Sequence, residues 1–491
     1  MFARLPTVIL RALMSASEVY RSPLGTRYAT SAMVSNFGDT RRVRLWRELW
    51  IALAEAEKEL GLPIPDEAVT AMRAHIDEVD FERVAELEAK FRHDVMAHVH
   101  HFGETAGDAA EKVIHLGATS CFVADNAELV MIRDGIELLL DRLHCVMEQL
   151  KAFAVEHREQ ATLAYTHFQP AQLTTVGKRA TLWMQDLAYD MESLQALARR
   201  LPLRGVKGTT GTQASFLALF DGDHDKVRML DDKVAAAMGF SKTVPVSGQT
   251  YPRKFDTWVI SALADLAGSA AKFGSDLRLL CHKREVEEPF GKNQIGSSAM
   301  AYKRNPMKSE RICSLARFVQ SLAANPMGTH ANQWFERTLD DSANRRLVIT
   351  EAFLATDGIM NLLADVTEAM VVYPAVIEAN LKEELPFMAT ENVIMRGAKA
   401  GLSRQDLHER VRVHSHAAAK VMKEEGRPND LLARMRADDA LSAHVTDAVI
   451  DPGMYVGRAP QQVDEFINGV VDPLLEQFSA HAGRFAPRVR V

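Results

Sequence analysis

The longest proline-free segment of the chain limits its possible folds most strongly. No proline occurs between Pro65 and Pro170, and a helix interior excludes proline because its ring removes a donor and clashes with the preceding turn. Within this segment, apolar residues recur at spacings of three and four, the period of one helix face. The pattern predicts a single helix of about seven turns or more, whose apolar face is formed by Leu129, Ile132, Ile136, Leu139, Leu143, Val146, Leu150 and Phe153.

Comparable patterns predict further long helices. They end near glycine or proline and occupy residues 174–200, 254–282, 307–324 and 342–370. A shorter helix is expected at residues 45–60, ending at Gly61, and strands do not alternate with helices. We therefore predict an all-α fold of three helical domains around a central long-helix bundle. The expected domains are residues 1–119, of which 1–21 are expected to be flexible, 120–372 and 373–491.

The long apolar faces also predict self-association. Helices of this length carry more apolar surface than short flanking domains can cover, so the excess is expected to face other copies of the chain. The sequence therefore predicts a homo-oligomer.

Composition and charge exclude several classes of partner. The net charge is -7, and acidic and basic residues are interleaved, so no nucleic-acid-binding face is expected. No run approaches the roughly 20 apolar residues of a membrane span. Four separated cysteines without a Cys-x-x-Cys pair indicate reduced thiols and a cytoplasmic protein.

Residues 1–17 carry two arginines and no acid, so a transit peptide, a disordered extension and a start at Met14 all remain open.

One loop concentrates residues suited to catalysis. Residues 296–306 read Gly-Ser-Ser-Ala-Met-Ala-Tyr-Lys-Arg-Asn-Pro. Gly296 permits a tight bend, and Asn305-Pro306 prevents a helix from absorbing the segment. If the loop folds over, the Lys303 ammonium comes beside Ser297 and any anion bound there. The alternative is an ordinary polar surface loop.

Histidines supply the next candidates. His167 precedes a proline-marked break between two long helices, and an imidazole can donate a proton to a departing nitrogen near neutral pH; a structural role is the alternative. Residues 92–101 contain four histidines, but their spacing does not match a zinc site. No metal is expected there. A hydrogen-bonding role for His93, whose tautomer Asp94 would fix, is more consistent with the pattern.

Glycine and arginine clusters suggest anion binding. The glycine-rich segment 205–212 lacks a nucleotide-binding motif, so it is either a turn that offers amides to an anion or a simple interhelical loop. Residues 308–311 and 336–346 place arginines where two long helices begin, which favours anions. Surface ion pairs are the alternative explanation.

Together these segments resemble the aspartase/fumarase superfamily, whose loop signature Gly-Ser-Ser-x-Met-Pro-x-Lys-x-Asn-Pro departs from this chain only at Ala301. Without the usual proline ring at Ala301, the loop is expected to be more mobile. Within the superfamily, the chain is similar to the animal-type adenylosuccinate lyase family from about residue 22 to its carboxyl end. The segments that carry this resemblance are residues 22–28, 92–98, 166–172, 338–346 and 385–392.

The resemblance implies a homotetramer of helical chains in which three subunits build each active site. It implies release of fumarate from adenylosuccinate and from succinyl-aminoimidazole-carboxamide ribotide, two reactions of purine biosynthesis, without a cofactor. Ser297 would be the base and His167 the acid, with His93 and Lys303 assisting. Substrate-binding roles are implied for Arg27, Tyr28, Arg92, Asp94, Thr119, Ser120, Thr166, Gln249, Arg311, Arg337, Ser342 and Arg346.

Two other functions remain open. An argininosuccinate lyase shares the loop signature but acts on a substrate without phosphate, and Arg311, Arg337 and Arg346 favour the nucleotide. A catalytically silent relative is the second possibility. The presence of both Ser297 and His167 argues against it.

Overall fold

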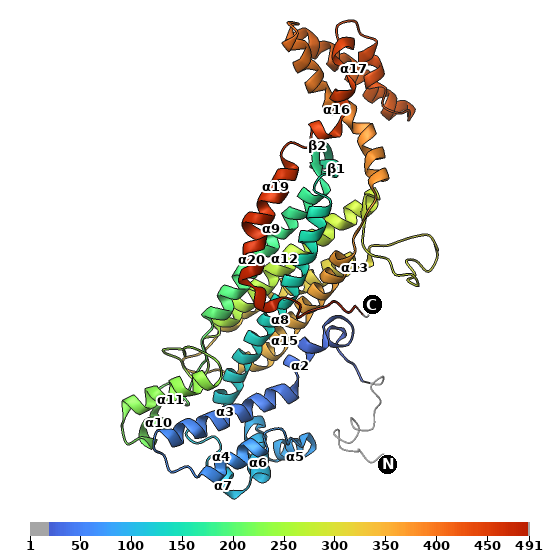
Figure 1. The fold of residues 1–491 in the computed structure, drawn as a ribbon. Helices are drawn as coiled ribbons and strands as arrows, with labels where there is room; N and C mark the ends of the chain where they lie inside the picture. Colours follow the sequence, from blue (N-terminus) through green and yellow to red (C-terminus); the bar gives the residue numbers. More distant parts are fainter. Residues whose placement is uncertain (1–18, 490–491) are drawn as a thin grey trace.

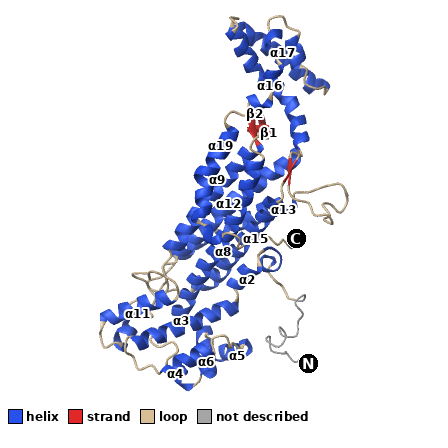
Figure 2. Cartoon of the chain, viewed as in Figure 1, coloured by secondary structure: helices blue, strands red, loops and turns tan. Residues whose placement is uncertain are grey.

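The computed structural model describes residues 19–489, so the expectations for residues 1–17 lie outside the described chain. The described part is mainly helical (Figures 1 and 2). The predicted all-α fold with a central long-helix bundle is confirmed. The domain limits at residues 119 and 372 stay a prediction.

Five long helices form the bundle; four lie within two residues of their predicted ranges, and the first includes the whole predicted apolar face from Leu129 to Phe153. They are α8 (Ser120–Glu156), α9 (Val176–Arg200), α12 (Lys254–Lys283), α13 (Met307–Leu322) and α15 (Asp340–Glu368). The eight predicted apolar positions of α8 are all buried, because neighbouring helices surround this helix. One continuous core therefore runs the length of the bundle.

The amino-terminal helices from residue 39 onward pack at one end of the bundle, lowest in Figure 1, whereas the two elements before them lie higher along it. Gly61 closes α3 as predicted: it has φ 105°, and its amide donates to the carbonyl of Lys58 (3.0 Å). The elements are η1 (Leu24–Tyr28), α2 (Ser31–Asn36), α3 (Asp39–Glu59), α4 (Asp66–Ala74), α5 (Phe81–Phe91), α6 (Asp94–Ala106) and α7 (Asp108–Glu111).

The carboxyl-terminal segment divides into two parts. α16 and α17 project beyond the bundle with a small core of their own, whereas α19 and α20 return along α8 and α9 (Figure 1). The helices are α16 (Pro374–Lys399), α17 (Arg404–Glu425), α18 (Leu431–Arg436), α19 (Ala459–Phe466) and α20 (Asp472–Gln477), with short turns η2 (Ser442–His444), η3 (Asp447–Ile450), η4 (Pro452–Met454), η5 (Ile467–Val471) and η6 (Ser479–His481).

A β-hairpin stands where the sequence indicated only a break between two helices. Strand β1 (Ala161–Thr166) pairs antiparallel with β2 (Gln169–Thr175). Pro170 fits at the edge of this two-stranded sheet, where no further strand needs its missing donor. The remaining elements are α10 (Ala214–Leu219), α11 (His224–Ala237), α14 (Asn325–Ala331) and the short strands β3 (Val286–Glu287) and β4 (Val371–Val372).

One described helix, α15, has the length and apolar composition of a membrane span. Its most apolar window has a mean hydropathy of 1.5, but 83% of that window is buried inside the protein. Burial of this extent is the behaviour of a central core helix.

Glu57 in α3 is a buried acid whose effect on the free energy of unfolding depends on pH. Neither carboxylate oxygen has a hydrogen-bond partner among the residues that the structure describes, and burial raises the pKa of Glu57 from 4.5 to about 8. Between these two values the folded chain holds a proton that the unfolded chain releases. The free energy of unfolding should therefore fall as pH rises from about 4.5 to about 8.

Replacing Glu57 with glutamine should remove this dependence. We expect Glu57→Gln to be more stable than the wild type by about 2–4 kcal/mol at pH 8.5, and to differ much less at pH 5.5. Urea unfolding at both pH values measures the difference. Glu88→Gln, at an exposed position of α5, is the control and should keep the wild-type pH dependence; an equal dependence in Glu57→Gln would contradict the assignment.

Candidate active site

The predicted site residues lie in three groups at different levels of the molecule. The lower group surrounds the first residues of α6, α8 and α15, the middle group is turn η1, and the upper group comprises the β1–β2 hairpin and the loop before α13. The sequence separates most members of the lower and upper groups by tens of residues or more, so the fold brings them together.

A buried ion-pair network organises the lower group. Arg253, just before α12, contacts Asp125 of α8 through two nitrogens (3.1 Å each) and Asp341 of α15 through Nε (2.6 Å). All three side chains are buried. Arg337 Nη1 also donates to Asp341 (3.2 Å). Because removing one partner would leave a buried charge unpaired, at a cost of about 3–5 kcal/mol, the network fixes the ends of these three helices.

Arg345 and Arg346 are neighbours in the sequence with opposite orientations. Arg345 is buried and its Nε donates to Asp256 (2.7 Å), whereas Arg346 is exposed. Arg346 pairs with Asp94 (3.0 Å) and so links α15 to the first turn of α6. The sequence cluster therefore splits into one buried arginine that supports the helices and one exposed arginine whose partner in this structure is Asp94.

His93 and Gln249 complete the lower group. The amide of Met96 donates to His93 Nδ1 (3.3 Å), so Nδ1 is an acceptor and the proton of the neutral ring lies on Nε2. The Met96 amide, and not the expected Asp94, therefore fixes the tautomer. Gln249 Nε2 donates to Thr119 Oγ1 (3.0 Å), and the Gln249 amide donates to the carbonyl of Glu336 (2.9 Å). The structure thus gathers the predicted residues Arg92, His93, Asp94, Thr119, Ser120, Gln249, Arg337, Ser342 and Arg346 at this end.

The middle group is Arg27 and Tyr28 in η1. Arg27 is exposed and Tyr28 is half-buried. A Cβ at Gly358 would lie 2.9 Å from Tyr28 Cβ, so glycine permits this close approach of the turn to α15.

The loop of residues 288–306 carries Ser297 and Lys303. Its ends are held: Glu288 caps α13 by accepting from the amides of Lys308 (3.1 Å) and Ser309 (3.0 Å). Its middle is largely exposed and projects from the bundle (Figure 1). A Cβ at Gly296 would lie 2.1 Å from the Lys303 carbonyl oxygen, so the loop folds over as expected. Within the described chain, however, no hydrogen bond joins Lys303 to Ser297.

Ser297 Oγ accepts from two backbone amides, those of Ala299 (3.3 Å) and Met300 (3.1 Å). Donors directed at an oxygen favour its anionic form. The two amides therefore stabilise the deprotonated oxygen that a serine needs to act as a base. Arg311 follows one turn into α13.

His167 lies at the tip of the β1–β2 hairpin. His167 and Phe168 both have positive φ, 53° and 56°, the arrangement of a type I′ turn that usually takes asparagine and glycine. Strained backbone at such bulky residues is typical of functional positions. The side chains of Thr166 and His167 are exposed at the tip, as the sequence predicted for His167.

The lower and upper groups are too far apart to meet within one chain. Thr119 and Ser120 begin α8, whereas the hairpin follows its last residue, and a helix of 37 residues is about 55 Å long. Lys308 pairs with Asp365, so the beginning of α13 lies beside the end of α15. That position is about 35 Å along α15 from Ser342.

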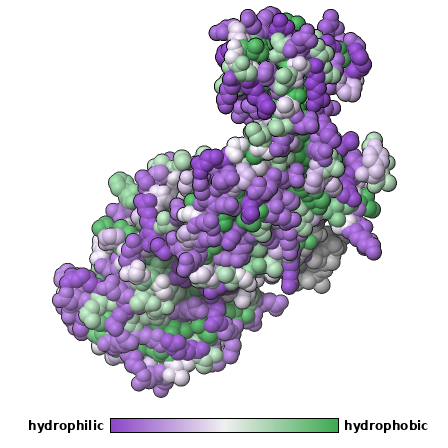
Figure 3. All heavy atoms as spheres, turned by 45° about the horizontal axis from the view of Figure 1, so that its top comes forward, coloured by the Kyte–Doolittle hydropathy of each residue, from purple (hydrophilic) through white to green (hydrophobic). Residues whose placement is uncertain are grey.

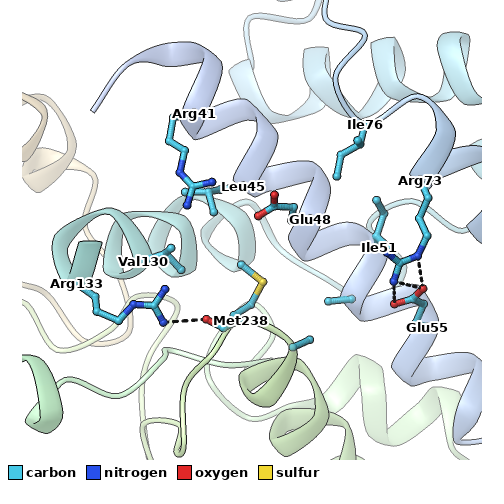
Figure 4. Close-up of a pocket in the computed structure, with 12 residues that line it drawn as sticks. Arg41, Leu45, Glu48, Ile51, Glu55, Arg73, Ile76, Val130, Arg133 and Met238 are labelled. Atoms are coloured by element: carbon cyan, nitrogen blue, oxygen red, sulfur yellow. Dashed lines mark hydrogen bonds and ion pairs between the residues drawn. The ribbon is translucent and has the colours of Figure 1, made fainter. Parts of the chain in front are cut away.

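The cavity shown in Figure 4 lies away from these three groups. It has a volume of about 240 Å³ between α3, α8 and the end of α11 and contains none of the predicted site residues. Its arginines are already engaged: Arg73 pairs with Glu55, Arg41 with Asp134, and Arg133 donates to the carbonyl of Met238. The cavity therefore offers no unpaired charge to a ligand. Among residues 19–489, no group of three possible metal ligands is found.

Sequence reasoning missed the residues that hold the site. The sequence analysis did not single out Asp125, Arg253 and Asp256, although charged residues inside or directly before predicted core helices are a possible signal. His115 was also missed: its Nδ1 accepts from Trp50 Nε1 (2.9 Å) just ahead of Thr119.

Comparisons with known proteins agree along nearly the whole chain. Residues 26–321 match the family model described as "Lyase", and residues 386–466 match "Adenylosuccinate lyase C-terminus". Adenylosuccinate lyase of Saccharomyces cerevisiae is 52% identical, covering 94% of this chain and 97% of that protein. For the Schizosaccharomyces pombe enzyme the identity is 50%, with 94% and 96% covered; for that of Schistosoma mansoni it is 47%, with 95% and 98% covered.

Two solved structures share the fold. The 3-carboxy-cis,cis-muconate lactonizing enzyme of Pseudomonas putida superposes with a TM-score of 0.80 at 24% identity, covering 93% of this chain and 99% of that one. Fumarate lyase of Mesorhizobium sp. BNC1 gives 0.76 at 23%, covering 92% and 100%. From the extent and identity of the sequence matches, the chain belongs to the adenylosuccinate lyase family.

Proposed function

We propose that the protein releases fumarate from adenylosuccinate, giving AMP, and from succinyl-aminoimidazole-carboxamide ribotide, giving the free carboxamide ribotide. The observation that carries the proposal is membership of the adenylosuccinate lyase family over nearly the whole chain. The exposed positions of His167 and of the loop that carries Ser297 support it. Both reactions belong to purine biosynthesis, and a cytoplasmic location is part of the proposal.

The reaction needs one base and one acid. Ser297 Oγ takes the proton from the carbon next to a carboxylate of the succinyl group. The electrons of that C–H bond form the double bond of fumarate as the carbon–nitrogen bond breaks. His167 protonates the departing nitrogen, which takes the electrons of the broken bond. The C–H electron pair that forms the double bond, the C–N electron pair that stays on nitrogen and the two proton transfers account for every bond that changes, so the proposal includes neither a cofactor nor a metal.

Ser297 must be activated, because a hydroxyl is a weak base in water. The two amides at Ser297 Oγ stabilise its anionic form. Closure of the loop over substrate would exclude water and strengthen this effect. Lys303, on the same folded loop, is the proposed cation that stabilises negative charge on the substrate carboxylate.

The remaining site residues bind and orient the substrate. Their positive charges and hydroxyl groups suit a phosphate and two carboxylates. His93, with Nε2 left as a donor, orients the substrate and supports its protonation. The substrate-binding residues in this proposal are Arg27, Tyr28, Arg92, Asp94, Thr119, Ser120, Thr166, Gln249, Arg311, Arg337, Ser342 and Arg346.

A complete site then requires several copies of the chain. We propose a homotetramer in which copies pack side by side in opposite directions, so that the lower group of one meets upper and middle groups of others. The distance of about 55 Å between the groups of one chain supports this arrangement. Exposed apolar side chains on the bundle helices provide surface for it. They include Leu182, Tyr189, Leu279 and Leu347, and Figure 3 shows hydrophobic areas interrupting the hydrophilic surface of the body.

The substrate assignment is tested by offering the purified protein two substrates. We expect fumarate, measured by its ultraviolet absorbance, from adenylosuccinate and none from argininosuccinate, because the arginines proposed to bind phosphate would have no phosphate to bind. Release from argininosuccinate alone would contradict the assignment. Release from neither would indicate a catalytically silent relative.

The two catalytic roles are tested by single substitutions. Ser297→Ala and His167→Ala should each lower kcat by at least about 10²-fold, the low end for a positioned acid or base. Steady-state kinetics with adenylosuccinate measure the effect. Ser298→Ala tests the neighbouring hydroxyl, and His408→Ala, at an exposed position of α17, is the matched histidine control. If Ser298→Ala lost activity and Ser297→Ala kept it, the base would be misassigned.

A further inference from the structure

Directly after turn η1, the chain contacts a buried ion pair that links α8 to α15. The amide of Thr30 donates to Asp357 Oδ2 (2.6 Å), and Thr30 Oγ1 accepts from Arg142 Nη2 (2.8 Å). Arg142 Nε lies 2.5 Å from Asp357 Oδ1, and both charged side chains are buried. Thr30 is two residues from Tyr28, so this link determines where the turn that carries Arg27 and Tyr28 lies against the bundle.

The carboxyl-terminal tail, residues 479–489, covers the same link. The ring of Phe485 lies 4.7 Å from Arg142 Cζ. Asn361 holds the tail backbone through two hydrogen bonds with Arg488, at 3.0 and 3.1 Å. His481 contacts Asp141 (2.7 Å), the residue before Arg142. Figure 1 accordingly shows the carboxyl end of the chain beside the η1 turn, although the sequence places them at opposite ends.

Helix geometry makes the turn and the tail share one support. Asn361 lies four residues after Asp357 and three residues after Gly358, so it shares a helix face with each of them. Asp357 contacts Thr30, Gly358 approaches Tyr28, and Asn361 holds the tail. A displacement of the tail would therefore expose the support of the turn.

The Phe485 ring protects the ion pair from water. A charge pair weakens as water raises the local dielectric constant, and an aromatic face also attracts a guanidinium directly. Phe485 is only partly buried and packs on the edge of the main core. Its removal should therefore loosen the Arg142–Asp357–Thr30 link without opening the core.

We infer that the carboxyl-terminal tail is a clasp that positions turn η1 for substrate binding. The inference rests on the proposed function for the roles of Arg27 and Tyr28. Phe485 and Asn361 are positioning residues, because they act on substrate only through the turn. Loss of the clasp should weaken substrate binding and leave the chemical step intact.

The test is Phe485→Ala in the full chain, with two measurements. Hydrogen exchange without substrate should be faster for the amides of residues 24–30 than in the wild type. KM for adenylosuccinate should rise by about threefold to tenfold, with kcat changed by less than about twofold. Phe485→Tyr, which keeps the ring, should restore both values. Phe466→Ala in α19, an equally half-buried phenylalanine of the carboxyl-terminal segment, is the matched control and should leave both unchanged.

Phe485→Leu is the second variant if the alanine variant does not fold, and it should show the same changes to a smaller extent. Unchanged exchange in residues 24–30 would overturn the clasp, and so would a fall in kcat at constant KM. The exchange measurement needs no activity. If the wild-type protein released no fumarate, the proposed function would fail while the exchange result still decided whether the tail holds the turn.

Discussion

The unbroken length of the bundle helices is the constraint on which the rest of this structure depends. Because α8 runs 37 residues without a break, it holds its first residues about 55 Å from the hairpin that follows it. The rigid core that makes such helices stable also prevents them from bending the two groups together. Functional groups at opposite ends can meet only if a second chain brings them.

Buried polar contacts give this long scaffold its precision. Arg253 joins the ends of α8 and α15 at the lower group, and Arg142 joins the middles of the same helices at η1. Each contact places a loop or turn that carries exposed polar residues. The loop of residues 288–306 and the hairpin are fixed at their ends and exposed in their middles, which suits segments that close on a substrate.

The sequence was sufficient for the helices because their signal is periodic and local. The apolar positions of α8 are all buried as predicted, and Gly61 ends α3. The sequence was insufficient for the hairpin. Pro170 indicated only a break between helices, and histidine and phenylalanine at the tip give no turn signal because two-residue turns rarely place them at positive φ. The sequence also did not show which of Arg345 and Arg346 is buried. Adjacent residues on a helix point in different directions, but only the packing of the neighbouring helices decides which of the two is covered. The loop residues were found through their motif, and their relation to the lower group required the fold.

The central claim, that one active site draws on several copies, is tested most directly by mixing two inactive variants. Ser297→Ala, in the upper group, and His93→Ala, in the lower group, would be co-expressed or unfolded and refolded together, and fumarate release would be compared with that of each variant alone. If different copies supply the two residues, some sites in the hybrids receive both intact side chains, and the mixture should regain up to about a quarter of wild-type activity. Activity no higher than that of the separate variants, in hybrids shown to contain both chains, would contradict the account.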